Sequence, residues 1–430
     1  LAAIEKDSKK VGTTGDKIDL ALLVDGLASE REQGITIDVA YRFFSTDKRK
    51  FIIADTPGHE QYTRNMATGA STADVAIILI DARQGILTQT KRHSYIASLL
   101  GIKNLIVAIN KMDLVDFSQE VFEKIKRDYN DIISFLPHHT DLNIEFIPIS
   151  ALDGDNILTN SPKCSWYKGL PLMPLLDTIP IHKQESSSFR LPVQYVIRPH
   201  LNFRGFSGTI ASGEIKVGDE ITVLPSRKTS KVKSIVSNDI KDLRPIGKDE
   251  VVETIEKAFA PMATTITLED EIDISRGDMI VKTGDIPKVS NHLSCMVVWM
   301  DETPLKLNQN YVIKRATSVL NGAFNSIEFK KNINTFDEVD ATELALNDIA
   351  KCTISLDREI AVDPYHENRY TGSFIIIDKY NNSTVGAGMI ISSVEGFAKL
   401  EEDKKVYSKA EIELNEFIRR NYPEWNCKAI

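Results

Sequence analysis

Four continuously apolar segments, separated by helix-length polar stretches, constrain the fold of this chain more than any other feature. The apolar segments are residues 51–54, 75–80, 105–109 and 146–149, and the stretches between them, 60–71, 88–100 and 118–135, favour helices. Strands that are apolar along their whole length fit a parallel sheet that is buried on both faces. Residues 1–183 are therefore predicted to form an α/β domain with a mostly parallel sheet.

The sequence changes character after a polar stretch at 182–188, which lacks periodicity and favours a linker. Short alternating segments follow, separated by turn signals such as Ala211-Ser212-Gly213 and Arg276-Gly277-Asp278. This pattern predicts two all-β barrels, over 184–288 and 289–395. The remaining residues, 396–430, form a charged, helix-prone tail.

Composition and charge narrow the classes of protein to consider. Lys and Arg number 52 against 61 Asp and Glu, a net charge of −9, so we expect no nucleic-acid partner. The longest apolar run, 75–80, is far short of the ~18 residues of a membrane span, and we expect no membrane partner. Four cysteines without a CxxC pair favour a reducing cytoplasm. Since the chain opens at Leu1 without a signal-peptide pattern, we expect its natural N-terminus further upstream.

The segment Asp55-Thr56-Pro57-Gly58-His59 directly follows the first apolar strand. Ligands of open α/β sheets bind at the carboxyl ends of the strands. There Asp55 can hold Mg²⁺, largely through water, and the backbone N–H of Gly58 can approach a terminal phosphate. The imidazole of His59 would be the catalytic group, orienting an attacking water. Alone, the segment fits a structural turn at least as well.

The segment Asn110-Lys111-Met112-Asp113 follows the strand at 105–109 and has the pattern of a guanine reader. The carboxylate of Asp113 would accept from N1–H and the 2-amino group, while the stem of Lys111 lies over the base and Asn110 ties neighbouring loops. Adenine lacks both donors and would leave the carboxylate unpaired, so the pattern predicts steep discrimination.

Two shorter segments indicate a nucleotide site only because of their positions relative to the other two. Ser150-Ala151-Leu152 follows the strand at 146–149, where the N–H of residue 151 can meet the guanine carbonyl oxygen. Gly34-Ile35-Thr36-Ile37-Asp38 precedes the first strand and predicts a switch loop, with Thr36 coordinating Mg²⁺ in the triphosphate state.

Together the four segments have the order and spacing of translation-factor-type GTPases, and the chain resembles that superfamily. The resemblance implies GTP and Mg²⁺ as cofactors. A phosphate-cradling GxxxxGK[ST] segment should precede residue 34, does not occur in the chain, and is expected upstream of Leu1. If that loop were truly absent, a nucleotide-binding scaffold without turnover would be the alternative.

The runs at 30–41 and 55–71 are similar to the large, GTP-binding subunits of bacterial sulfate adenylyltransferases, as are 20–26, 204–209, 271–278 and 384–389. This resemblance covers nearly the whole chain. It implies a GTPase domain followed by two β-barrels, and a heterodimer with a small catalytic subunit. GTP hydrolysis on the large subunit would drive synthesis of adenosine 5′-phosphosulfate from ATP and sulfate on that partner.

An elongation factor that delivers aminoacyl-tRNA is the competing interpretation, because it shares the guanine motifs. The variants at 55–71 and 271–278 favour the sulfate family, and the negative net charge gives no support for tRNA.

Overall fold

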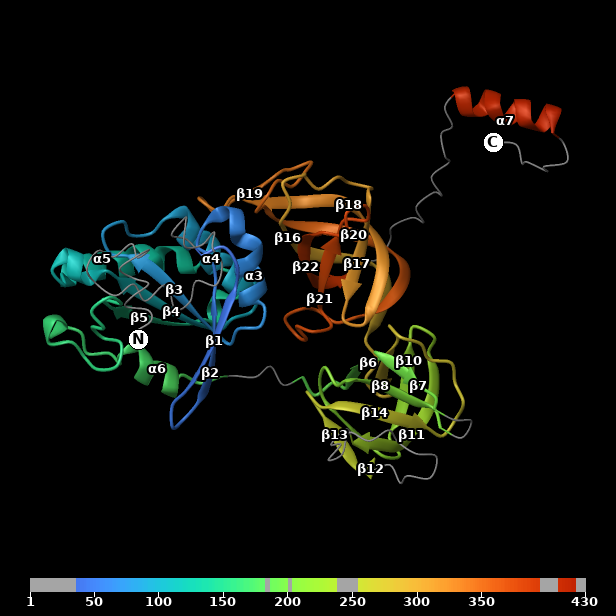
Figure 1. Ribbon diagram of the computed structural model, residues 1–430, viewed down its shortest axis with the longest axis horizontal. Helices are drawn as coiled ribbons and strands as arrows, with labels where there is room; N and C mark the ends of the chain where they lie inside the picture. Colours follow the sequence, from blue (N-terminus) through green and yellow to red (C-terminus); the bar gives the residue numbers. More distant parts are fainter. Residues whose placement is uncertain (1–35, 182–185, 200–202, 238–253, 395–408, 423–430) are drawn as a thin grey trace, which may run out of the picture.

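The computed structural model describes residues 36–181, 186–199, 203–237, 254–394 and 409–422. They form an α/β domain, a first β domain (190–282), a second β domain (288–393) and a C-terminal helix, α7 (Lys409–Asn421) (Figure 1). No helix within these ranges is long and apolar enough to cross a membrane.

A parallel sheet lies at the centre of the α/β domain. Its strands are β3 (Val75–Asp81), β4 (Asn104–Asn110) and β5 (Asn143–Pro148), in the order β3-β4-β5. The register places Asp81 opposite Asn110, so the polar strand ends meet at one edge of the sheet.

The central strand β4 is buried on both faces, as the apolar pattern predicts, whereas Ile77 and Leu79 of β3 are 41% and 62% exposed among the described residues. In β4, Leu105, Val107 and Ile109 belong to one core cluster, with α4 (Thr88–Leu99) and α5 (Gln119–Ile133). Ile106 and Ala108 belong to another, with α6 (Leu172–Thr178) packed against it. Helices thus cover opposite faces of one central strand.

The strand predicted at 51–54 has an antiparallel partner that the sequence does not predict. It forms β2 (Lys50–Asp55), paired with β1 (Ala40–Ser45) in a hairpin. Among the described residues this hairpin is a sheet of its own, so the expectation that residues 51–54 lie in the parallel sheet is wrong. The helix predicted at 60–71 is divided into a 3₁₀ turn, η2 (Glu60–Tyr62), and α3 (Thr63–Ala70). The Thr63 hydroxyl donates to the Glu60 carbonyl at 2.8 Å, which marks the division.

The described part of the α/β domain also contains the short 3₁₀ turns η3 (Met112–Val115), η4 (His139–Asp141) and η5 (Pro162–Cys164).

In the residues of the first β domain that the structure describes, the strands are antiparallel. The sheet order is β6-β15-β10-β11-β14-β8-β7, with β12 on β11 and a separate β13–β9 pair. The bounds are β6 (Arg190–Pro192), β7 (Tyr195–Ile197), β8 (Gly205–Thr209), β9 (Glu214–Lys216), β10 (Glu220–Leu224), β11 (Lys228–Ser237), β12 (Thr254–Ile255), β13 (Lys257–Phe259), β14 (Ala263–Leu268) and β15 (Met279–Lys282).

The second β domain is a closed barrel, because β17 pairs with both β21 and β18 and so completes the ring β17-β21-β22-β16-β20-β18. Closure removes free strand edges from this ring. The bounds are β16 (Lys288–Trp299), β17 (Asn310–Arg315), β18 (Ser318–Lys331), β19 (Glu338–Val339), β20 (Ile349–Val362), β21 (Ser373–Ile377) and β22 (Thr384–Ser393).

A buried ion pair joins the two β domains. Arg190 of β6 donates through Nε to Asp363 Oδ1 at 3.0 Å, and the other Asp363 oxygen accepts from the Thr371 hydroxyl at 2.7 Å. Both charged side chains are at most 7% exposed. A buried charge that loses its partner is costly, so this junction resists separation.

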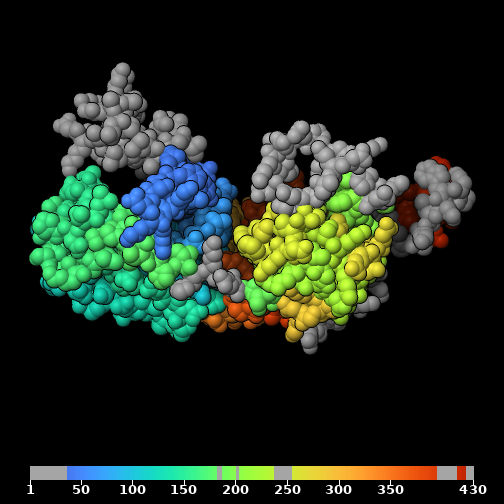
Figure 2. Space-filling view, turned by 90° about the horizontal axis from the view of Figure 1, so that it is seen from below, coloured from blue at the N-terminus to red at the C-terminus, as the bar shows by residue number. Residues whose placement is uncertain are grey.

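The second β domain also packs against the α/β domain, and Figures 1 and 2 both place its orange barrel beside the blue and teal elements. Phe336 of the barrel stacks on Tyr95 of α4 and on Phe135, with ring centroids 6.0 and 5.5 Å apart. One continuous core cluster contains residues of both domains, so the contact is apolar at its centre.

Candidate functional site

Asn110, at the end of β4, joins two loops at the carboxyl edge of the sheet. Its Oδ1 accepts from the Lys111 amide at 2.8 Å and from the Ala151 amide at 3.0 Å. The loop after β4 is thereby fixed to the loop after β5. The sequence predicts that the Ala151 amide meets a base; in this structure that amide donates to Asn110 instead.

Lys111 is held by an acidic residue that sequence reasoning missed. Asp81, at the end of β3, lies opposite Asn110 in the sheet, and Lys111 Nζ is 3.0 Å from its Oδ2. Arg83 also binds this carboxylate, through NH2 at 2.7 Å and Nε at 3.0 Å. The Arg83 guanidinium, aided by Lys111, holds the pKa of Asp81 well below its usual range. Asp81 therefore stays ionised and orients the lysine.

Asp113 is a carboxylate acceptor at this edge. It lies in η3, whose first residue, Met112, is completely buried and donates its amide to the Ile149 carbonyl at 3.2 Å. The carboxylate of Asp113 is half-buried and has no hydrogen-bond donor among the residues that the structure describes. Its acceptor capacity is thus available to a ligand. Nearby, Ser150 is buried and Leu152 is 57% exposed.

A second group of predicted residues lines a cavity of about 620 Å³, which we term the switch cavity. It is lined by Thr36, Gly58, His59, Glu60 and Gln89. The structure therefore brings together the predicted switch threonine, the glycine and the predicted catalytic histidine. A Cβ built on Gly58 would meet nothing within 4 Å, so the chain's own packing does not require glycine there.

His59 is the N-cap of η2, and its imidazole is exposed. Its Nδ1 accepts from the Gln61 amide at 3.4 Å, which is a long contact. In a neutral ring with this arrangement the proton lies on Nε2. The ring can then donate from Nε2 to an oxygen in the switch cavity.

Two residues of α3 hold the switch segments and were missed by sequence reasoning. Asn65 donates through Nδ2 to the Ile37 carbonyl at 2.6 Å, which fixes the segment next to Thr36. Gly69 lets α3 lie against Thr56, because a Cβ there would be 2.5 Å from Thr56 Cγ2. Neither contact has a periodic pattern that would reveal it in the sequence.

Gly34 and Ile35 lie outside the described residues, and Asp38 is exposed. Asp55 is half-buried at the end of β2, and Pro57 is buried. No cluster of three or more His, Cys, Asp or Glu suited to a metal occurs in the described ranges. The predicted metal ligands, Thr36 and Asp55, supply oxygen atoms only, which is the donor type that Mg²⁺ prefers.

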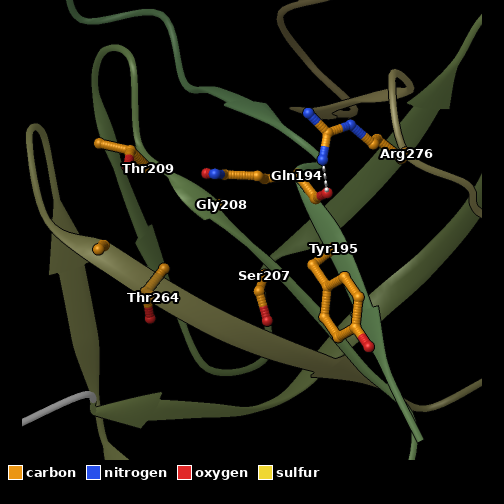
Figure 3. Close-up of a pocket in the computed structure, with 8 residues that line it drawn as sticks. Gln194, Tyr195, Ser207, Gly208, Thr209, Thr264 and Arg276 are labelled. Carbon is orange, nitrogen blue, oxygen red and sulfur yellow. Dashed lines mark hydrogen bonds between the residues drawn. The ribbon is translucent and has the colours of Figure 1, made fainter. Parts of the chain in front are cut away.

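Another hollow lies in the first β domain, over β7, β8 and β14 (Figure 3). The exposed ring of Tyr195 borders it, and Arg276 NH1 donates to the Gln194 carbonyl at 3.4 Å. No residue lining it has a buried polar atom without a partner. It therefore offers less specific chemistry than the edge of the parallel sheet.

The carboxyl edge and the switch cavity, on a parallel sheet followed by two β domains, define a GTPase domain of the translation-factor class. The sequence family described as "Elongation factor Tu GTP binding domain" matches residues 1–185, and "GTP-eEF1A C-terminal domain-like" matches residues 292–391. The fold predicted from the sequence is confirmed.

Proteins named sulfate adenylyltransferase subunit 1 are similar along the whole chain. The one from Sulfurovum sp. (strain NBC37-1) is 59% identical, and the one from Pseudoalteromonas atlantica 57%; each alignment covers 100% of this chain and 88% of the relative. The chain belongs to this family, which confirms the resemblance and makes it a transferase subunit with a GTPase domain.

Among solved structures, that of sup35 complexed with GDP has a TM-score of 0.44 and 21% identity, covering 82% of this chain and 84% of that chain. This likeness is too low to bear on function.

Proposed function

We propose that this chain is the regulatory GTPase of a sulfate adenylyltransferase. It binds GTP with Mg²⁺, and hydrolysis drives formation of adenosine 5′-phosphosulfate from ATP and sulfate on a small catalytic partner. Family membership supports the transferase role. The name "subunit 1" of the relatives supports a partner subunit.

The observation that carries the nucleotide assignment is the half-buried carboxylate of Asp113, two residues after a lysine that is ion-paired with Asp81. Lys111 is anchored by Asp81, and Asn110 fixes the adjoining loop at Ala151. Asp113 retains its acceptor capacity, which suits the paired N1–H and 2-amino donors of guanine. Adenine would leave this carboxylate unpaired.

The proposed chemistry takes place in the switch cavity. Thr36 and Asp55 would hold Mg²⁺, which neutralises charge that develops on the phosphates. The backbone N–H of Gly58 would meet the terminal phosphate, and no atom of the chain lies within 4 Å of the position that a Cβ would take there. His59 donates from Nε2 to the attacking water and orients it.

The test is to isolate the full-length protein from its own lysate and assay the eluate. Pyrophosphate release that depends on ATP plus sulfate, is raised by GTP and accompanies a smaller co-purifying chain supports the proposal. If the eluate carries aminoacyl-tRNA and releases no sulfate-dependent pyrophosphate at any GTP concentration, the elongation-factor function takes its place.

A further inference from the structure

Asn347 of the second β domain contacts the α/β domain beside the proposed catalytic histidine. Its Nδ2 donates to the Glu60 carbonyl at 2.8 Å, and Glu60 directly follows His59. Asn347 is 7% exposed, and its backbone amide donates to the Trp299 carbonyl at 2.9 Å. The side-chain amide that donates to Glu60 thus belongs to a residue whose backbone is hydrogen-bonded to the barrel.

Glu60 is also held from α4. Its Oε2 accepts from Gln89 Nε2 at 3.3 Å and from Arg92 NH1 at 3.4 Å. Its carbonyl oxygen accepts from the Thr63 hydroxyl as well as from Asn347. The turn that begins after His59 is thus held by its own helix, by α4 and by the second β domain.

Further contacts hold the second β domain against the α/β domain near Asn347. Besides the Phe336 stack, the Tyr365 hydroxyl donates to the Leu100 carbonyl at 3.1 Å, and Lys91 Nζ donates to the Asn334 carbonyl at 2.7 Å. These contacts fix the barrel along α4. The position of Asn347 relative to Gln89 and Arg92 is therefore set by the docked barrel.

The polar contact at Glu60 is incompletely satisfied. A cavity of about 340 Å³ between α4 and the barrel is lined by Arg92 and Asn347, among others. Arg92 Nε and Asn347 Oδ1 are both buried without a hydrogen-bond partner. By contrast, both oxygens of Asp363 at the junction of the two β domains are paired. Buried polar groups that are only partly hydrogen-bonded contribute little stability. The contact of Asn347 with Glu60 is therefore easier to release than that of Arg190 with Asp363.

We propose that Asn347 is a positioning residue for GTP hydrolysis. By holding the Glu60 carbonyl it fixes η2, and with it the imidazole of His59 that caps this turn. Docking of the second β domain then sets the hydrolysis rate, so a partner that shifts this domain changes the rate. This inference rests on the proposed function, because it assumes that His59 acts in the hydrolysis of GTP.

The test compares Asn347→Gly with Asn382→Gly in the full-length protein. Both asparagines have left-handed backbones, with φ of 69° and 59°, which glycine adopts without strain. Asn382 lies in an exposed turn of the same domain and serves as the matched control. Asn347→Asp is the second variant, because it keeps the size but places an acceptor against the Glu60 carbonyl.

We expect Asn347→Gly to lower single-turnover GTP hydrolysis about three- to tenfold, the scale of one neutral hydrogen bond. GTP affinity should match that of Asn382→Gly, the melting temperature should lie no more than about 4 °C below it, and Asn347→Asp should be at least as slow as Asn347→Gly. Unchanged turnover overturns the inference. So does a slower rate that GTP affinity or melting temperature explains, since that indicates a structural role.

The wild-type protein separates the two hypotheses. Failure of the wild type to hydrolyse GTP overturns the proposed function, and this inference with it. Hydrolysis at equal rates by wild type and Asn347→Gly overturns this inference alone.

Discussion

Replacing Asp113 with Asn tests the proposed choice of base. The half-buried carboxylate accepts no hydrogen bond from the described residues, so both guanine donors would bind oxygen atoms with free acceptor capacity. Hydrogen bonds to a charged group contribute about 1.5–3 kcal/mol each. Two such bonds amount to about 3–6 kcal/mol, which corresponds to a loss of GTP affinity of about 10²-fold or more. Xanthine has an oxygen where guanine has its amino group, so it should bind the variant better than guanine does.

The assay is a titration of wild type and Asp113→Asn with GTP and with xanthosine triphosphate. Asp116→Asn is the matched control, because Asp116 is exposed at the end of the same 3₁₀ turn. It makes the same chemical change outside the proposed contact and should bind GTP like the wild type. Unchanged GTP affinity in Asp113→Asn would refute the assignment of this edge to guanine.

Three further predictions concern the switch cavity and its supports. His59→Ala should lower GTP turnover by about 10²-fold in single-turnover assays with binding nearly intact, and a parallel loss of binding would contradict this. Gly69→Ala should lower the free energy of unfolding in urea by about 1 kcal/mol, because the contact with Thr56 outweighs the better helix propensity; a stabilised variant would contradict it. Because Arg83 lowers the pKa of Asp81, the stabilisation that ionised Asp81 provides is present above its usual pKa of 3.8 and is lost as the pH falls below it. The difference between the urea midpoints of wild type and Asp81→Asn should shrink between about pH 7 and about pH 3.

Local pattern was enough to predict the three parallel strands of the α/β domain. Its central strand, β4, is buried on both faces, and that environment requires an apolar side chain at nearly every position. The continuous apolar run at 105–109 is the direct consequence of this requirement. The residues after the strand, Asn110 to Asp113, are also local, so their place at the carboxyl edge followed from the strand.

Contacts between distant segments could not be predicted in this way. The strand β1 alternates only weakly between half-buried and exposed residues, so its pairing with β2 left little signal. The bond from Asn65 to Ile37 spans 28 positions, and the bond from Asn347 to Glu60 spans 287. Each depends on one polar side chain meeting a backbone carbonyl, which leaves no periodic signature in the sequence.

The central claim is that GTP hydrolysis on this chain drives adenylyl transfer on its partner. The most direct measurement is the final yield of adenosine 5′-phosphosulfate from ATP and sulfate, using the complex purified from its own lysate. Parallel reactions contain GTP, a non-hydrolysable GTP analogue or no guanine nucleotide. The account predicts a yield with GTP above the equilibrium yield without it, and no such excess with the analogue. Equal final yields in all three reactions would contradict it.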